Sequence, residues 1–512
     1  MSEISNTKRI ARNTLMLYFR QILIMAVSLY TVRVVLNVLG AEDYGIYNVV
    51  AGVVTMFGFL SGAMATASQR YFSFDIGKGD FDSLKASFSV SILIHVIVGI
   101  VMVLLGESFG VWFIRERLVI PYSRFVSAQW VYQFAIISFV FTVITAPFMA
   151  LIIAYEDMTI YAYVSIVECA LRLCIALFIQ FLPTDTLISY GFLMLLVTIV
   201  NTSIYRLICR KKYKLRWYPK LCTKKKVYEM FSFVGWNMFG ASIGIFKVQL
   251  VNILLNQYFG PIVNTSRGLA NQVNNALMSF SQNFSTALKP QIIKQYAIGK
   301  QKELLHLVFQ GCKCIYFLTF LFTLPLIVET DFVLHLWLKE IPVYTVDFTR
   351  LVLLDALIDS ISYPMMSAVQ ATGKIRLYQC VISGIQIANF PLAWICLSLQ
   401  FEPTSVSVVA VSLGICCLIA RLCIMHGFYK YSVLTFLQTV ILRILIVTGL
   451  SFASVFAITA VLPTTIFFSF INLCLAFVIT FTICILFGFD KQERHGMYSI
   501  IKQYAYTHRF MR

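Results

Sequence analysis

TLISYGFLMLLVTIVNTSIYRLIC, residues 186–209, runs directly into RKKYKLRWYPKLCTKKK, residues 210–226. The first stretch is 24 residues long and carries a single charge, that of Arg206. Because about 20 apolar residues in a helix cross the hydrocarbon core of a bilayer, it predicts a membrane-spanning helix. The second stretch has nine Lys and Arg and no Asp or Glu. That bias is typical of a loop on the cytoplasmic side of a membrane.

Apolar stretches of this kind recur along the whole chain. Its 512 residues are 59% hydrophobic and 12% charged, with a mean hydropathy of +0.81, which is more apolar surface than a soluble fold can bury. We therefore predict an all-α polytopic membrane protein with about 14 transmembrane helices. The predicted spans are 14–38, 44–72, 84–107, 126–153, 158–182, 186–209, 230–258, 261–288, 304–328, 346–371, 376–400, 404–429, 434–461 and 464–488.

Basic residues fall mainly on one side of these spans. Of the 41 Lys and Arg, 29 lie in alternate connections and at the two ends. This count includes Arg421 and Lys430, which we assign to a cytoplasmic connection over 421–430. The positive-inside rule places that side and both termini in the cytoplasm. The net charge of +18 therefore indicates contact with anionic membrane lipids and not with nucleic acid.

The two halves of the chain look like repeats. Tyr44-Gly45 and then Gly77-Lys78-Gly79 follow successive spans of the first half, and Phe259-Gly260 and Gly299-Lys300-Gln301 do so in the second, at an offset near 220 residues. Such repeats predict two pseudo-symmetric lobes that rock about a central cavity. We expect a six-span N-terminal lobe over 1–209, a basic cytoplasmic linker over 210–229, a six-span C-terminal lobe over 230–430, two further spans over 431–488 and a cytoplasmic tail over 489–512.

The predicted span 261–288 is unusually polar. Its amide side chains recur three and four residues apart and so share one helix face. Hydrogen bonding between packed helices would account for some of them, but the stripe is too long for packing alone. We interpret it as one wall of a water-filled cavity that suits a sugar. The wall residues are Asn264, Asn271, Asn274, Asn275 and Gln282.

Four cations within predicted spans point to the same cavity, namely Arg20, Arg33, Lys247 and Arg267. A charge at the bilayer centre costs about 3 kcal/mol on insertion scales, so it normally faces a cavity or a partner. Arg20 and Arg33 are thirteen residues apart, about 220° around an ideal helix. Arg33 therefore either faces the cavity from a bent helix or extends outward to the interface.

Acidic residues within the spans give two further predictions. Glu168 and Arg172 are four residues apart, the spacing of an ion pair within one helix, and we interpret them as a structural pair. Asp355 and Asp359 have the same spacing but repel each other unless one is protonated or a cation lies between them. They are candidates for coupling to a Na⁺ or H⁺ gradient, and no other cofactor is predicted.

Neither an enzyme nor a metal protein is indicated. Among the thirteen Cys, Cys312-x-Cys314 and Cys416-Cys417 come closest together, and neither spacing matches a zinc or redox motif. No zinc-protease or phosphate-loop motif occurs. The Gly-x-Ser-x-Gly pattern from Gly240 to Gly244 lies inside the predicted span 230–258 and so lacks the strand-to-helix turn of a nucleophile elbow. We therefore predict no metal site and no catalytic residues.

Three segments carry a resemblance to a known family: Asn13-Thr14-Leu15, Leu39-Gly40-Ala41-Glu42-Asp43-Tyr44-Gly45-Ile46-Tyr47 and Gly77-Lys78-Gly79-Asp80. With the span count, the basic central loop and the two-lobe repeat, the chain resembles bacterial polysaccharide flippases, including those for O-antigen-type lipid-linked oligosaccharides. These belong to the multidrug/oligosaccharidyl-lipid/polysaccharide exporter superfamily. The resemblance covers essentially the whole chain.

The resemblance implies a transporter of the bacterial inner membrane that serves surface polysaccharide biosynthesis, lipopolysaccharide included. Such proteins carry undecaprenyl-diphosphate-linked oligosaccharides from the cytoplasmic to the periplasmic leaflet by alternating access, beside other polysaccharide-assembly proteins. Arg20, Lys247 and Arg267 match the family's cationic cavity, and Arg33 and Arg70 match it less closely. These cations would neutralise the diphosphate.

Two alternatives compete with the flippase. A multidrug cation antiporter of the same superfamily has a similar fold but usually about twelve spans and an acidic centre, whereas the first and seventh spans here are basic. A membrane glycan polymerase or ligase needs a sizeable periplasmic loop. The outer connections 108–125 and 329–345 are short and present no acid–base constellation.

Overall fold

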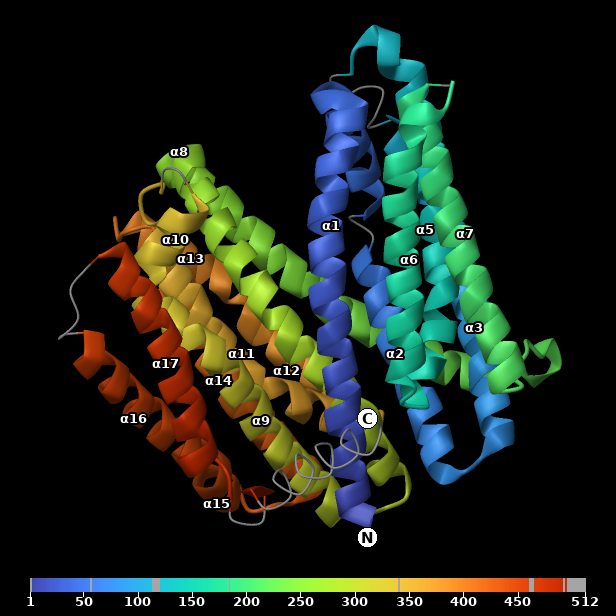
Figure 1. Cartoon of the computed structure of the whole chain (residues 1–512). Helices are drawn as coiled ribbons and strands as arrows, with labels where there is room; N and C mark the ends of the chain where they lie inside the picture. Colours follow the sequence, from blue (N-terminus) through green and yellow to red (C-terminus); the bar gives the residue numbers. More distant parts are fainter. Residues whose placement is uncertain are drawn as a thin grey trace, which may run out of the picture. The chain divides into compact units, whose positions relative to one another are not determined.

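The computed structural model describes residues 2–55, 58–112, 120–183, 185–338, 341–459, 465–490 and 493–494. These residues form helices joined by short connections, with no β-strand among them (Figure 1). The predicted all-α class is confirmed. The chain divides into two compact units. We call residues 13–241 the first-half unit, and residues 1–12 with 242–512 the second-half unit.

The helices of the first half are α1 (Ser2–Thr55), α2 (Gly58–Lys78), α3 (Phe81–Leu105), α5 (Phe125–Ala154), α6 (Met158–Phe178) and α7 (Thr186–Lys212). The long helix α8 (Lys224–Ala297) starts in the first-half unit and continues into the second. The remaining helices are α9 (Gln301–Val328), α10 (Thr330–Trp337), α11 (Thr345–Thr372), α12 (Arg376–Ile387), α13 (Asn389–Ser398), α14 (Ser405–Tyr429), α15 (Val433–Phe436), α16 (Leu442–Thr459) and α17 (Ile466–Phe487).

Most of the predicted spans coincide with single helices, whereas 44–72 covers the end of α1 and most of α2. The span 126–153 is α5, and 346–371 is α11, each within one residue at both ends. Within the described ranges, eleven helices are long and apolar enough to cross a membrane. The span 376–400 consists of two helices, α12 and α13, which meet at Ala388. Because Pro391 lacks an N–H to donate to the preceding turn, a break is expected there.

Glycine breaks divide the two longest helices into arms. Gly40 in α1 and Gly260 in α8 have non-helical backbone angles. Each therefore lies between two spans that the sequence predicts as successive, and of these four spans 230–258 is among the eleven helices that are long and apolar enough to cross a membrane. The first-half residue that matches Gly260 in conformation is Gly40, so the pairing of Gly45 with Gly260 in the sequence repeat is wrong by five residues.

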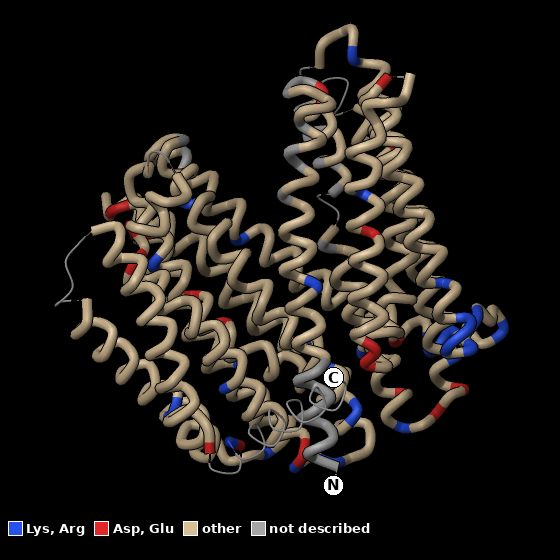
Figure 2. Tube along the Cα trace, viewed as in Figure 1, with Lys and Arg blue, Asp and Glu red and all other residues tan. Residues whose placement is uncertain are grey.

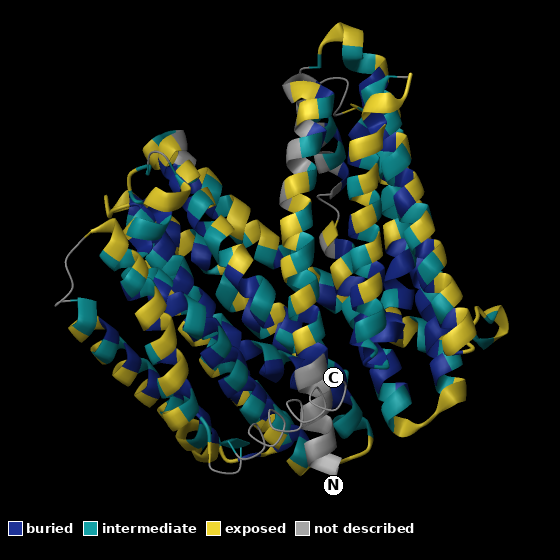
Figure 3. Cartoon of the chain, viewed as in Figure 1, coloured by how far each residue is buried: buried dark blue, intermediate teal, exposed yellow. Residues whose placement is uncertain are grey.

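Each unit has its own apolar core. In the first-half unit, the ring of Phe88 packs between Phe72 and Phe148, with centroids 5.9 and 5.5 Å away. In the second-half unit, buried side chains of α9, α11, α14, α16 and α17 form one large cluster. The outer side chains of α17 are apolar and exposed, as a lipid-facing surface requires, and include Val478 at 57% and Phe481 at 50% (Figure 3).

The basic segment between α7 and α8 folds back onto the first-half unit (Figure 2). The backbone N–H of Tyr218 donates to Ser89 Oγ at 3.0 Å. Lys226 Nζ donates to Ser83 and lies 3.8 Å from the buried carboxylate of Asp75. The Tyr213 hydroxyl donates to Asp157, and burial together with this bond raises the pKa of Tyr213. The linker is thus attached to the ends of α2, α3 and α6 that the charge rule predicts to be cytoplasmic.

Candidate functional site

A cluster of four charged residues lies within the helices of the second-half unit. We call it the second-half charge cluster: Lys247 of α8, Asp355 and Asp359 of α11, and Arg421 of α14. Lys247 is half-buried, and its positive charge favours the ionised form of Asp355. Asp355 also lies against α14, because its Oδ1 is 2.9 Å from where a Cβ on Gly414 would be. The cluster therefore pairs two cations with two carboxylates.

Arg421 is the centre of the polar network in this cluster. Its side chain is 8% exposed, and its Nη1 lies 3.3 Å from Asp359 Oδ1. The same guanidinium donates to Ser362 Oγ at 2.6 Å and to the Tyr378 hydroxyl at 3.2 Å. The assignment of Arg421 to a cytoplasmic connection is therefore wrong, because it lies inside α14, eight residues before the end of the helix. Arg421 joins α11, α12 and α14.

Arg267 joins the two arms of α8. It is 9% exposed, and its Nη1 donates to the backbone carbonyl of Val248, at 3.4 Å, and to the side-chain oxygen of Asn252. Both acceptors lie before the break at Gly260, whereas Arg267 lies after it. Part of its hydrogen-bonding capacity therefore fixes the angle between the arms.

The second arm of α8 exposes its polar face. Gln272, Asn275 and Gln282 are exposed, whereas Asn264, Asn271 and Asn274 are half-buried. Ser281 on the opposite face is fully buried and shares a hydrogen bond with Thr319 at 2.6 Å. A helix that faced lipid would expose apolar side chains, as α17 does. The exposed face of this arm is therefore suited to water or to a polar ligand.

Arg20 belongs to a polar group in the first-half unit. Its guanidinium lies 4.6 Å from the centroid of the Tyr161 ring, and Nη1 is 3.5 Å from Ser165 Oγ. One turn further along α6, the Glu168 carboxylate accepts hydrogen bonds from Arg172 at 2.6 Å and from Asn201 at 2.7 Å. The ion pair predicted from the spacing of Glu168 and Arg172 is confirmed.

Two further arginines are predicted from the sequence to belong to the cavity. The side chain of Arg33 lies outside the described residues. Arg70 is buried and packs against aromatic rings of α2 and the first arm of α8, with Tyr71 at 4.7 Å, Phe74 at 5.0 Å and Phe233 at 5.7 Å. Those contacts are cation–π interactions within the first-half unit.

Lys313 has a partner that sequence reasoning missed. Its ammonium lies 2.6 and 2.8 Å from the two carboxylate oxygens of Glu493, and both side chains are nearly fully buried. The residues are 180 positions apart, so no local spacing indicates the pair. It attaches the segment that follows α17 to α9.

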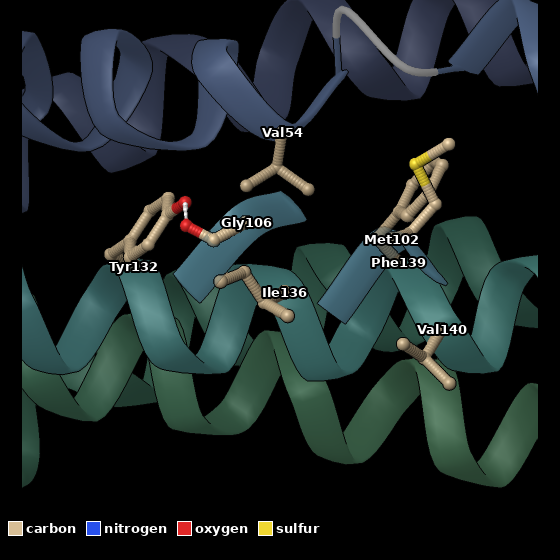
Figure 4. A pocket seen from close by; sticks show the side chains of 7 residues that line it. All are labelled: Val54, Met102, Gly106, Tyr132, Ile136, Phe139 and Val140. Atoms are coloured by element: carbon tan, nitrogen blue, oxygen red, sulfur yellow. Dashed lines mark hydrogen bonds between the residues drawn. The ribbon is translucent and has the colours of Figure 1, made fainter. Parts of the chain in front are cut away.

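A small cavity in the first-half unit is too small and too apolar to be a substrate site (Figure 4). Its volume is about 10 Å³, room for about one water molecule. The Tyr132 hydroxyl at its edge already donates to the Gly106 carbonyl at 2.8 Å. The lining residues are Val54, Met102, Gly106, Tyr132, Ile136, Phe139 and Val140. In the part of the chain that the structure describes, no three His, Cys, Asp or Glu side chains converge as a metal site would need.

Solved transporters share this architecture at low sequence identity. No family model and no curated protein matches the chain at a significant level. A multidrug resistance MATE family transporter of the MOP superfamily, in an outward-facing conformation, matches with a TM-score of 0.71 at 11% identity, over 84% of this chain and 98% of that one. A MATE in the straight conformation matches with a TM-score of 0.70 at 11% identity, over 83% of this chain and 96% of that one. A MOP superfamily transporter from Pyrococcus furiosus matches with a TM-score of 0.70 at 10% identity, over 82% of this chain and 96% of that one.

These matches define the class of fold. The chain is a multi-pass membrane protein with the all-helical fold of the MATE transporters in the MOP superfamily. At 10–11% identity the likeness extends to the fold and no further. What the protein does must therefore be inferred from its side chains.

Proposed function

We propose that this protein is a flippase that moves an undecaprenyl-diphosphate-linked oligosaccharide from the cytoplasmic to the periplasmic leaflet by alternating access. The product would serve surface polysaccharide biosynthesis, including that of lipopolysaccharide. The observation that carries the proposal is the exposed polar face of the second α8 arm, with Gln272, Asn275 and Gln282. Amides at this density suit the hydroxyl groups of a glycan, since each amide both donates and accepts hydrogen bonds.

Cations within the spans support an anionic substrate. Arg20 in the first-half unit and Lys247 in the second are the cations that we assign to the diphosphate, with Arg33 and Arg267 as further candidates. Guanidinium and ammonium groups both bind phosphate oxygens, the first in a forked geometry and the second as a point charge. Carriage of a large polar headgroup requires such groups at membrane depth, where they are otherwise costly.

Coupling and location are further parts of the proposal. Asp355 and Asp359 would couple transport to a Na⁺ or H⁺ gradient, in balance with Lys247 and Arg421 beside them. The protein would lie in the bacterial inner membrane with both termini in the cytoplasm, the linker on anionic lipids and polysaccharide-assembly proteins as partners. Reporter fusions after Lys220 and Arg512 test the sidedness, and a periplasmic signal at either one would contradict it.

A multidrug cation antiporter is the second candidate. It is favoured by the fold match to a multidrug resistance MATE transporter and by the two carboxylates of α11. The Pyrococcus furiosus neighbour is described as having a binding pocket of reversed polarity that suggests a different function. The fold therefore accommodates sites of either sign, and the polarity of the site must discriminate between the candidates.

Reconstituted vesicles distinguish the two functions. Purified protein in liposomes is given a fluorescent polyprenyl-diphosphate-linked sugar, and the fraction that a membrane-impermeant reductant can reach is measured over time. Matched liposomes are loaded with a fluorescent organic cation, and its export is followed. Flipping of the lipid without export of the dye supports the flippase. Export of the dye alone would establish the antiporter in its place.

A further inference from the structure

The ion pair of Glu168 and Arg172 lies at the middle of a membrane-spanning helix. The span formed by α6 and its last turn is Met158–Phe181, 24 residues. Both charged residues lie within about 4 Å of its midpoint, at 1.5 Å per residue. Yet the Arg172 side chain is 46% exposed and that of Glu168 27% exposed. A pair whose only role was to hold two helices together would be expected to be buried between them.

The exposed charges do not lie on the lipid-facing side of α6. Tyr163, Val167 and Phe178 form an exposed apolar stripe, at 61%, 45% and 66% exposure. Arg172 is nine residues beyond Tyr163, which is about 180° around an ideal helix. Helix α6 therefore exposes an apolar stripe on one side and a polar one on the other. Since a charge that faces lipid at this depth costs about 3 kcal/mol, the polar side must face water or a polar ligand.

Four residues of α6 make up this polar side, and we call them the first-half polar stripe: Tyr161, Ser165, Glu168 and Arg172. Their spacing of four, three and four residues keeps them on one face. Arg20 of α1 joins the stripe through Tyr161 and Ser165. With Glu168 between the two arginines, the group has a formal charge of +1.

Arg172 keeps most of its hydrogen-bonding capacity. A guanidinium has five N–H donors, and among the described residues its hydrogen-bond partner is Glu168 alone. Glu168 is itself fixed by Asn201 of α7. The carboxylate thus holds the guanidinium in place and leaves its remaining donors available to a ligand. This is the arrangement of a pre-positioned oxyanion site.

We propose that Arg172, together with Arg20, binds an oxyanion of the transported molecule, and that Glu168 positions Arg172 and neutralises it when no substrate is bound. The ligand chemistry is a phosphate or carboxylate group. It could belong to the diphosphate or to an acidic sugar of the glycan. This inference rests on the proposed function, and it gives the first-half unit a second substrate-binding cation.

A charge swap separates binding from structure. In the double variant Glu168→Arg/Arg172→Glu, the ion pair is retained but the exposed group at position 172 becomes an anion. We expect the double variant to fold and accumulate in the membrane, with a somewhat lower melting temperature because Asn201 loses its carboxylate acceptor, and to transport at least tenfold more slowly. The matched control is Asp331→Arg/Arg350→Asp, a swap of another exposed pair, with side chains 64% and 40% exposed. The control should transport like the wild type.

A second variant covers the case in which the swapped protein does not fold. Arg172→Gln removes the cation alone, and its transport is measured per molecule of monodisperse, reconstituted protein. Arg172→Lys keeps the positive charge but loses the bidentate geometry of the guanidinium, and it should retain an intermediate transport rate. Normal transport per molecule by Arg172→Gln, or by a folded swap variant, would show that the pair is structural and would overturn the inference.

Two lipid substrates identify the source of the oxyanion. Liposomes contain either a polyprenyl diphosphate that carries a neutral sugar or one that carries a uronic acid. Equal losses on both substrates assign Arg172 to the diphosphate, and a loss on the uronic acid alone assigns it to the glycan. If the wild type moves neither lipid, the proposed function fails and this inference fails with it. If the wild type moves both and Arg172→Gln does as well, the inference alone fails.

Discussion

Gly40 and Gly260, 220 residues apart in the sequence, have the same backbone conformation. Their φ and ψ angles are 76° and 169° in α1, and 78° and −173° in α8. Gly79 and Gly299 share the same offset and a positive φ, and α5 and α11 begin 220 residues apart, at Phe125 and Thr345. The two halves are therefore structural repeats, and each repeat begins with a helix that is broken once by glycine.

A side chain at either glycine should destabilise the protein. This region of φ and ψ is accessible essentially to glycine alone, and other residues there cost about 1–3 kcal/mol. Gly40→Ala and Gly260→Ala should each lower the melting temperature of the purified protein and its abundance in the membrane. Gly244→Ala is the control, since Gly244 has a negative φ and a Cβ added to it would meet no heavy atom within 4 Å. Equal melting temperatures for all three variants would contradict the role of the breaks.

The buried arginine of the second-half charge cluster should be structurally essential. Arg421 is 8% exposed, whereas its partner Asp359 is 44% exposed. The main cost of its removal is therefore the loss of its buried hydrogen bonds to Ser362 and Tyr378, at about 1–3 kcal/mol for each buried polar group left unsatisfied. Arg421→Met should therefore reduce the folded protein strongly, and the double variant Arg421→Met/Asp359→Asn should recover part of the loss. Thermal unfolding in detergent measures both.

The exposed pair of Arg350 and Asp331 provides the comparison. Their side chains are 40% and 64% exposed, and exposed pairs contribute about 0–1 kcal/mol. Arg350→Met should hence shift the melting temperature much less than Arg421→Met does. Comparable shifts would show that Arg421 contributes no more than a surface residue.

The membrane helices can be predicted from the sequence because one physical rule governs each of them. A span must be apolar over a fixed length, so runs such as 126–153 and 346–371 mark α5 and α11 closely. The sequence shows less clearly which residues of the two repeats correspond to each other. Both Gly40 and Gly45 lie in the polar turn between two spans, and only the backbone angles identify Gly40 as the break.

The candidate site is predictable only in part. In-span charges are visible in the sequence, but their partners are not, because the partners lie on other helices. Arg421 pairs with Asp359, 62 residues away, and Lys313 pairs with Glu493. The sequence assigns Arg421 to a connection because it is near the end of an apolar run. Glu168 and Arg172 are predictable as a pair, since their contact lies within one helix.

The polar face of the second α8 arm should react with water-soluble reagents. Asn275→Cys and Gln282→Cys, in a background cleared of the thirteen native thiols, should be labelled by a membrane-impermeant maleimide in intact vesicles. Both positions are exposed, and the reactive thiolate is disfavoured in apolar surroundings. Ser281→Cys on the buried face and Val478→Cys on the lipid-facing side of α17 should stay unlabelled until the protein is unfolded in detergent. The cavity wall is refuted if all four positions behave alike.

Lys247 should be required for transport and not for folding. It is half-buried near Asp355, and an ammonium contacts phosphate as a point charge. Lys247→Ala should reduce lipid flipping at least tenfold while the protein still accumulates in the membrane, and Lys247→Arg should retain part of the rate because the charge is kept.

Lys313 is the matched control, since it is also a lysine within a span but forms a buried ion pair with Glu493. Lys313→Ala should lower abundance strongly, through the unpaired carboxylate, and leave the rate per folded molecule near that of the wild type. Lys247→Ala/Asp355→Asn provides a second check, because it removes the carboxylate left without its cation. That double variant should be as stable as the wild type. Its transport rate is compared with that of Asp355→Asn alone, because Asp355 is itself a candidate for ion coupling, and it should be the lower of the two. If it transports normally, Lys247 neutralises Asp355 and does nothing more, and the anion-binding role would pass to the first-half unit.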